Sequence, residues 1–321
     1  MGRVCHRARS PPVYSEEVAT QKGIPIVSPM QDRSGEFERH RPRLFGIAYR
    51  MLSSRVDADD VLQDAYLRWH RGASDELRSP EAWLVTTVTR LCIDRLRAAR
   101  AEREHYVGPW LPEPLIGESA PAADAHAELS SSLSIAFLVV LEQLTPDERA
   151  AFLLHEVFDT DYPEIAQILG KSEAACRQMV SRARKRVRDQ RPRTEVTEAA
   201  RRAVLERFVH AMQTQDKAAL LKLVAEGASW VSDGGGRARA ALKVIRGRER
   251  VVRFALGAVA RHLDRLTFEM TAVNGEPALA LRAGDALFSV ITVRTDGVRI
   301  LDVFTVLNPS KLGTQAVIAA D

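Results

Sequence analysis

The sequence predicts a multidomain protein: two all-α blocks, a helical bundle and a helix-turn-helix, followed by an α+β domain with a curved antiparallel sheet. Apolar residues recur at helical spacing from Phe37 to Glu104 and from Asp161 to Arg193, whereas after Leu266 they alternate at every second position. A chain of 321 residues that is 45% hydrophobic is long enough for two or three domains with their own cores.

The composition favours a soluble protein of the cytoplasm. Cys5, Cys92 and Cys176 are widely separated, which is typical of a reducing compartment and gives no metal-ligand spacing. No apolar run approaches the roughly 20 residues that span a bilayer, so no membrane contact is expected. The formal net charge of +4 is compatible with a polyanionic partner. No cofactor and no metal are expected.

Residues 1–33 are predicted to be an unstructured tail. Pro11, Pro12, Pro25 and Pro29 interrupt any periodic pattern there. A second interpretation is that translation begins at Met30, directly before the first helical pattern.

The first block contains three predicted helices. Residues 44–52 are apolar nearly all round, which indicates a helix buried in a bundle. The next helix has an acidic first turn, in accord with the helix dipole, and an apolar inner stripe. Three polar residues are left together on its exposed face: Asp60, Gln63 and Asp64. By itself such a group is usually only solvent-facing. A third helix starts with Ser79 as cap and Pro80 as first residue, and its far end is rich in arginine.

The second block ends in a predicted helix-turn-helix. Asp161 caps the first helix, Gly170 ends it and Ser172 caps the second helix. From position 171 to 193 there are nine basic residues against two acidic ones. The apolar stripe of the second helix faces the protein: Cys176, Val180, Ala183 and Val187. This pattern is typical of a helix that lies in the DNA major groove, and a solvated basic helix is the alternative.

The helix face opposite this stripe is suited to DNA. Arg177 and Gln178 have the donors and the amide that read guanine or adenine edges, and the later arginines are better placed for phosphates.

An acidic segment separates the two blocks. The 45 residues from Glu104 to Glu148 contain no lysine or arginine. Four prolines make its first part extended and semi-rigid, and a plain linker is the simplest interpretation. Trp110 stands between prolines and is expected to be exposed. An exposed tryptophan is unfavourable in a segment that serves only as a spacer.

The last third is predicted to be α+β. Helical patterns cover residues 196–213, 216–225 and 247–262, and alternating apolar runs follow. The dipeptides Asn274-Gly275 and Asp296-Gly297 stand between these runs and indicate hairpins.

The runs FGIAYRML, DADDVLQDAYLRWH, PEAWLVTTVTRLCIDRLR and TPDERAAFLLHEVFDTDYPEIAQILGKSEAACRQMVSRARKRV together resemble regions two and four of a bacterial extracytoplasmic-function (ECF) sigma factor. The last third resembles a SnoaL-like cone. WLPEP in the linker, DGGG and a terminal NPxKL are similar to the SigJ-type group of these factors, which carries a fused SnoaL-like domain. Arg237 departs from the lysine usual in that group, and arginine and lysine bond differently.

The resemblance implies partners and roles for particular residues. Core RNA polymerase, through its beta-prime clamp, would bind Asp60, Gln63 and Asp64. The minus-ten promoter element would meet Arg90, Asp94, Arg97 and Arg100. Trp83 is a candidate stacking platform for a flipped base, with a core position as the alternative. The minus-thirty-five element would be read by Lys171, Ser172, Glu173, Arg177, Gln178, Ser181 and Arg182.

The predicted organisation follows from these assignments: 1–33 tail, 34–105 region two, 106–130 acidic linker, 131–192 region four and 196–321 SnoaL-like regulatory domain. The last domain is expected to dock on region two or the linker, in place of a separate anti-sigma protein, through Asp233, Arg237, Asn308, Pro309 and Lys311. An unknown small molecule is a possible ligand of a pocket lined by Trp230, Phe254, Phe288 and Phe304, although such aromatics are by default core.

Enzymatic activity is not expected. Asp233 is the obvious candidate for a catalytic base of the isomerase type, but the strand region from Thr267 to Leu307 contains no tyrosine to accompany it. The predicted function is promoter-specific transcription initiation. A DNA-binding regulator that never touches polymerase and a DNA-tethered SnoaL-like ligand-binding or isomerase protein are the alternatives.

Overall fold

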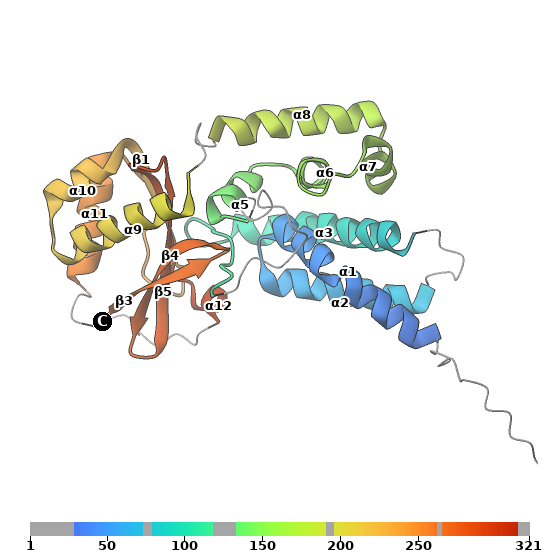
Figure 1. The fold of residues 1–321 in the computed structure, drawn as a ribbon, viewed down its shortest axis with the longest axis horizontal. Helices are drawn as coiled ribbons and strands as arrows, with labels where there is room; N and C mark the ends of the chain where they lie inside the picture. Colours follow the sequence, from blue (N-terminus) through green and yellow to red (C-terminus); the bar gives the residue numbers. More distant parts are fainter. Residues whose placement is uncertain (1–28, 73–78, 118–132, 191–195, 262–264, 314–321) are drawn as a thin grey trace, which may run out of the picture.

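The computed structural model describes residues 29–72, 79–117, 133–190, 196–261 and 265–313 (Figure 1). Helices form the part drawn in blue to green, and a curved sheet with helices on one side forms the part drawn in yellow to red. Among the described helices, none is long and apolar enough to cross a membrane.

The first helical block consists of α1 (Pro29–Leu52), α2 (Arg55–Gly72) and α3 (Pro80–Glu104). The prediction of a tail through residue 33 is wrong at its end, because α1 already begins at Pro29, a residue well suited to a first helical position. The turn at Arg33 is held by Trp69, whose indole nitrogen donates to the Arg33 carbonyl at 2.9 Å. The rest of the predicted tail and the start of translation lie outside the described residues.

The second block packs on the first. It contains α5 (Ile135–Leu141), α6 (Pro146–Glu156), α7 (Tyr162–Leu169) and α8 (Glu173–Gln190). The predicted caps are present: Glu164 N donates to Asp161 at 2.9 Å, Gly170 adopts φ 62°, and Ala175 N donates to Ser172 at 3.2 Å. In Figure 1, α6 and α7 lie between α8 and the first bundle, and one continuous hydrophobic core joins the two blocks.

The last domain begins with α9 (Glu198–Gln213) and α10 (Lys217–Leu223) and contains α11 (Arg248–Ala260) and α12 (Pro309–Leu312). Its strands are β1 (Val224–Asp233), β2 (Ile245–Arg246), β3 (Thr267–Val273), β4 (Glu276–Ala283), β5 (Ala286–Thr295) and β6 (Ile300–Val306). They form one sheet in the order β2-β1-β6-β5-β4-β3.

The sheet differs from the expected antiparallel one at a single pair, because β1 runs parallel to β6 and the other neighbours are antiparallel. Strand β1 itself escaped prediction. Its residues are buried on both faces over Ala228–Trp230, so they do not alternate, and three glycines follow directly.

The two faces of the sheet pack against different partners. One face, with Trp230 and Val303, lies under α9, α10 and α11. The other face, with Phe304 and Val306, packs with Leu111 of the linker and Ile135 of α5. Phe304 therefore does not line a pocket with Trp230, because Trp230 pairs with Val303 and successive residues of a strand face opposite sides.

Candidate nucleic-acid and polymerase interface

Helix α8 presents its basic face to solvent. The predicted inner stripe is buried, and Arg177, Gln178, Ser181 and Arg182 are exposed. Arg177 is held by Glu173 at 2.9 Å and lies 5.3 Å from the Tyr162 ring centre. This pairing orients a forked donor near the N-terminal end of the helix, where a recognition helix contacts base edges.

Glu148 of α6 holds two arginines of the basic face of α8. Glu148 accepts from Arg182 at 3.3 Å and from Arg186 at 3.1 Å. Burial alone would raise the pKa of Glu148, but hydrogen bonds from Thr145 and the two arginines outweigh burial and lower it. The carboxylate is therefore charged and fixes two cations of the face.

The acidic group on α2 lies on a separate surface. Asp60, Gln63 and Asp64 are all exposed, as the pattern predicts. Arg95 of α3 bonds to Asp57 at 2.9 Å and approaches Asp60 at 3.4 Å. Two exposed polar side chains, Gln63 and Asp64, have no side-chain partner among the described residues. The group is available to a protein surface, and its role remains a prediction.

Cations that the resemblance assigns to DNA instead hold the two blocks together. The guanidinium of Arg90 donates to the carbonyls of Gln167 and Ile168, each at 2.9 Å, at the C-terminal end of α7. Arg97 of the minus-ten set and Lys171 of the minus-thirty-five set share one carboxylate, Asp147, at 2.9 Å and 3.0 Å. Some members of each set are thus engaged in contacts between the two blocks.

Two further members of the minus-ten set are exposed. Asp94 lies 3.7 Å from Arg97, and Arg100 has no side-chain partner among the described residues. Trp83 packs against Trp69, with 5.4 Å between ring centroids, and joins the edge of the core. This packing corresponds to the core position that was the alternative to a stacking platform.

A buried ion cluster also joins the blocks. Glu142 of the acidic segment bonds to Arg103, to Arg149 at 2.8 Å and to Ser53 at 2.9 Å. Burial would raise the pKa of Glu142, but Arg149 and Arg103 outweigh burial and hold it below its usual value. The acidic segment has no positive charges of its own, and α3 and α6 supply them here through Arg103 and Arg149.

The first part of the linker is an irregular segment that packs on the sheet domain. Asp233, at the end of β1, is fully buried. It accepts from the Tyr106 hydroxyl at 2.5 Å, from the Leu111 backbone nitrogen at 2.8 Å and from Lys311 at 2.7 Å. Lys311 also donates to the Leu111 carbonyl at 2.5 Å. These oxygens are fully engaged, so Asp233 is a linker anchor and is not placed as an accessible base.

Trp110 is not exposed as predicted. Its ring is half-buried between two cations, with Arg103 at 4.1 Å and Lys311 at 4.0 Å from the ring centre. Cations over an indole face are attracted by its quadrupole, which accounts for an aromatic residue between prolines. Burial first of all, and then the bond to Asp233, raise the pKa of Tyr106. Burial also lowers the pKa of Lys311, against the pull of Asp233.

The glycines after Asp233 leave room for Tyr106 and Asn308 to approach the backbone. Gly235 has φ +57°, and a Cβ there would lie 2.3 Å from Asn308 Nδ2 and 2.8 Å from the Tyr106 hydroxyl oxygen. Asn308 caps α12 and donates to that hydroxyl at 2.8 Å. Arg237 reaches Ser310 at 2.7 Å, and Pro309 is the first residue of α12.

One contact residue has no functional signal in the sequence. Asn274 occupies the predicted hairpin turn with φ 54°, yet it is fully buried. Its amide donates to the Tyr49 hydroxyl at 2.7 Å and to the Leu133 carbonyl at 2.8 Å, and its oxygen accepts from Leu115 N at 2.9 Å. The turn therefore ties region two, the linker and the sheet domain together, although the dipeptide alone indicates only a turn.

Comparisons with known proteins agree with this geometry. The sigma-70 region 2 family matches residues 37–102, and the sigma-70 region 4 family matches residues 134–187. The chain is 38% identical over 289 residues to the ECF RNA polymerase sigma factor SigJ of Mycobacterium tuberculosis, covering 86% of this chain and 92% of that protein. It is 30% identical to the probable factor SigI of the same species over 283 residues, 87% and 94% of the two chains.

The crystal structure of M. tuberculosis SigJ aligns with a TM-score of 0.69 at 35% identity and covers 88% of this chain and 99% of that one. Two helical blocks joined by a linker, the second with a helix-turn-helix, define a sigma factor of the sigma-70 type. The chain belongs to the family of ECF RNA polymerase sigma factors. It is accordingly an initiation factor that binds core RNA polymerase and promoter DNA.

Proposed function

We propose that the C-terminal domain regulates this cytoplasmic sigma factor by holding its linker, in place of a separate anti-sigma protein. The observation that carries the proposal is the Asp233 contact, in which a fully buried carboxylate binds Tyr106 and Leu111 of the linker and Lys311 of α12. The contact joins the DGGGR loop, the WLPEP linker and the NPSKL segment in one network.

A promoter with two elements requires the two helical blocks to separate. Elements at minus ten and minus thirty-five are about 25 base pairs apart, or roughly 85 Å of duplex at about 3.4 Å per pair. The compact arrangement holds Arg90 within 2.9 Å of α7 and makes Arg97 and Lys171 share Asp147. We infer that it opens before both elements are contacted.

The linker contact bears on this opening because the linker joins the two blocks. Leu115 and Leu133, on either side of the undescribed residues 118–132, both bond to Asn274 of the sheet domain. While these bonds persist, the ends of the linker stay together and the blocks stay close. Release of the linker from the C-terminal domain would let its full length separate them.

Within this function, the faces have separate roles. We propose that Asp60, Gln63 and Asp64 contact core polymerase, that Asp94 and Arg100 with Arg90 and Arg97 contact the minus-ten element, and that the exposed face of α8 reads the minus-thirty-five element. The exposure of all three α2 side chains and of Arg177 and Gln178 supports these roles.

The test is in vitro transcription with purified core polymerase and the variants Asp233→Asn and Lys311→Met. Promoter output should change while binding to core polymerase is kept, because the contact uses none of Asp60, Gln63 and Asp64. Asp285→Asn makes the same charge change at an exposed turn and should behave as the parent chain. Thermal unfolding of each variant separates a released linker from a misfolded domain. Unchanged output in both variants with intact folding would contradict the proposal.

A further inference from the structure

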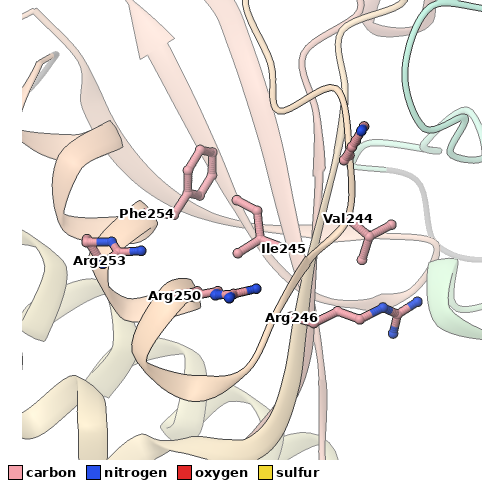
Figure 2. A pocket seen from close by; sticks show the side chains of 7 residues that line it. Val244, Ile245, Arg246, Arg250, Arg253 and Phe254 are labelled. Carbon is pink, nitrogen blue, oxygen red and sulfur yellow. The ribbon is translucent and has the colours of Figure 1, made fainter.

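A hollow lies between the edge strand β2 and helix α11, on the regulatory domain (Figure 2). It has a volume of about 490 Å³ and is lined by Lys243, Val244, Ile245, Arg246, Arg250, Arg253 and Phe254. Figure 2 shows Arg250 extending from α11 toward Ile245, with Phe254 beside them, and Arg246 and Val244 on the other side of β2. None of these residues belongs to the linker contact or to the DNA-facing helices.

The hollow gathers positive charge that the protein does not neutralise. The side chains of Lys243, Arg246, Arg250 and Arg253 are exposed, and none makes a hydrogen bond or an ion pair within the described chain. The neighbouring Arg248 shows the contrast, since it donates to the Val224 carbonyl at 2.9 Å and lies 3.7 Å from Glu226. An anion is the group that such a site attracts.

Helix α11 adds to this potential. It begins beside the hollow, and its N-cap Gly247 provides no side-chain cap. The first backbone N–H groups of a helix carry partial positive charge and favour anions. Glu249 is the one acidic residue within α11, and it is exposed.

The inner wall of the hollow is apolar, and Trp230 lies behind it. Phe254 packs edge-on against Trp230 with 5.3 Å between ring centroids, and Ile245 pairs with Trp230 across β1 and β2. Trp230 is only 3% exposed, and its indole nitrogen has no hydrogen-bond partner among the described residues. Phe254 and Ile245 thus form a firm apolar wall that is supported from behind by the buried Trp230 ring.

We propose that this hollow binds a small organic anion, an aromatic or similarly flat apolar body that carries a carboxylate or a phosphate group. The forked guanidinium groups of Arg250 and Arg253 recognise the charged end, since arginine binds both groups through paired hydrogen bonds. Phe254 and Ile245 contact the apolar body, and Trp230 packs behind them. A DNA backbone is the less suitable occupant, because it would meet the cations and leave the apolar wall unused.

The test is a binding titration of the full chain with matched probes. Indole-3-acetate supplies the carboxylate, phenyl phosphate supplies the phosphate, and indole-3-acetamide has the shape of the first without its charge. Calorimetry gives the affinity, and the indole N–H resonance of Trp230, assigned from the Trp230→Phe spectrum, reports on the site. The variant pair is Arg250→Gln with Arg253→Gln. Arg261→Gln, at the far end of α11, is the matched control.

We expect an anionic probe to bind and to shift the Trp230 resonance, the amide to bind at least about tenfold more weakly, and the double variant to lose a similar factor. Arg261→Gln should bind as the parent chain does. Equal binding of indole-3-acetate and indole-3-acetamide would overturn the proposal. Unchanged binding by the double variant would overturn it as well. So would a surface that binds duplex DNA through Arg250 and Arg253 and neither of the small anions.

Discussion

The Lys311 ammonium lies 2.7 Å from Oδ2 of Asp233, and the carboxylate of this pair is completely buried. Burial of two charges is unfavourable unless further hydrogen bonds satisfy them. Here the Tyr106 hydroxyl and the backbone of Leu111 supply those bonds, and both belong to the linker. The C-terminal domain therefore completes the hydrogen bonds of its buried carboxylate only when the linker is in place.

Gly235→Ala should release the linker. A Cβ at this position meets Asn308 and the Tyr106 hydroxyl, whereas a Cβ at Gly284 meets nothing within 4 Å although its φ is similarly positive, +59°. Gly284→Ala is thus the control for backbone strain and should cost about 1 kcal/mol. We expect Gly235→Ala to cost clearly more and to raise amide exchange in residues 106–111, measured by hydrogen-exchange mass spectrometry. Equal exchange in the two variants would show that the loop tolerates the methyl group.

Asp147→Asn should loosen the compact arrangement of the helical blocks. The substitution leaves Arg97 and Lys171 without their shared carboxylate, and exposed pairs of this kind contribute up to about 1 kcal/mol. Binding to promoter DNA should therefore strengthen by about fivefold at low salt, measured by fluorescence anisotropy. Asp159→Asn removes an exposed carboxylate without a side-chain partner in the described chain and serves as control. An identical gain in both variants would indicate only a change of net charge.

The Glu142 cluster makes stability depend on pH. The pKa of Glu142 is lower in the folded chain than its ordinary value of 4.5, so the folded state binds the proton less readily than the unfolded state. Its contribution is complete above about pH 4.5 and is lost as the pH falls through the folded value. Urea unfolding between pH 7 and pH 3.5 should show this loss.

Glu142→Gln should reduce that pH dependence and lower stability at pH 7 by about 3 kcal/mol, because Arg149 is left buried with its charge uncompensated. Glu148 acts in the same direction, so some pH dependence will remain. A parent-like pH profile in Glu142→Gln would show that other carboxylates account for the acid sensitivity.

The recognition helix should separate sequence reading from phosphate binding. Arg177→Ala and Gln178→Ala should each cost about 1 to 3 kcal/mol on the cognate minus-thirty-five sequence and relax its specificity. Lys185→Ala, further along the same exposed face, should weaken all sequences alike and reduce the salt dependence. Competition binding with base-substituted duplexes distinguishes these patterns. A uniform loss in all three variants would mean that the helix reads no bases.

Local patterns predicted much of the fold. The stripe of α8, the exposed acidic group of α2 and the caps Asp161 and Ser172 all follow from spacing within a few residues, and the structure contains each of them. Strand β1 escaped because burial on both faces removes the alternation that marks a strand.

The linker contact was only partly predictable. The motifs indicated Asp233 and Lys311, but nothing local indicated that Tyr106 would bond to Asp233 or that Asn274 would bond to the linker. Asn274 and Tyr49 are 225 positions apart, and the same asparagine would be read as a turn residue in any hairpin. Trp110 was expected in solvent because one of its two cations, Lys311, comes from a distant part of the chain, and the other, Arg103, approaches it only through the fold of the linker against α3.

The separation between Leu111 and Lys311 has a consequence for synthesis. The two residues are 200 positions apart, so at about 5 to 20 residues per second a ribosome makes the lysine roughly 10 to 40 s after the leucine. During that interval the promoter-binding helices are already made, but the contact of Lys311 with Leu111 and Asp233 cannot yet form. A truncated chain that ends before α12 would lack the Lys311 contacts with Leu111 and Asp233 altogether.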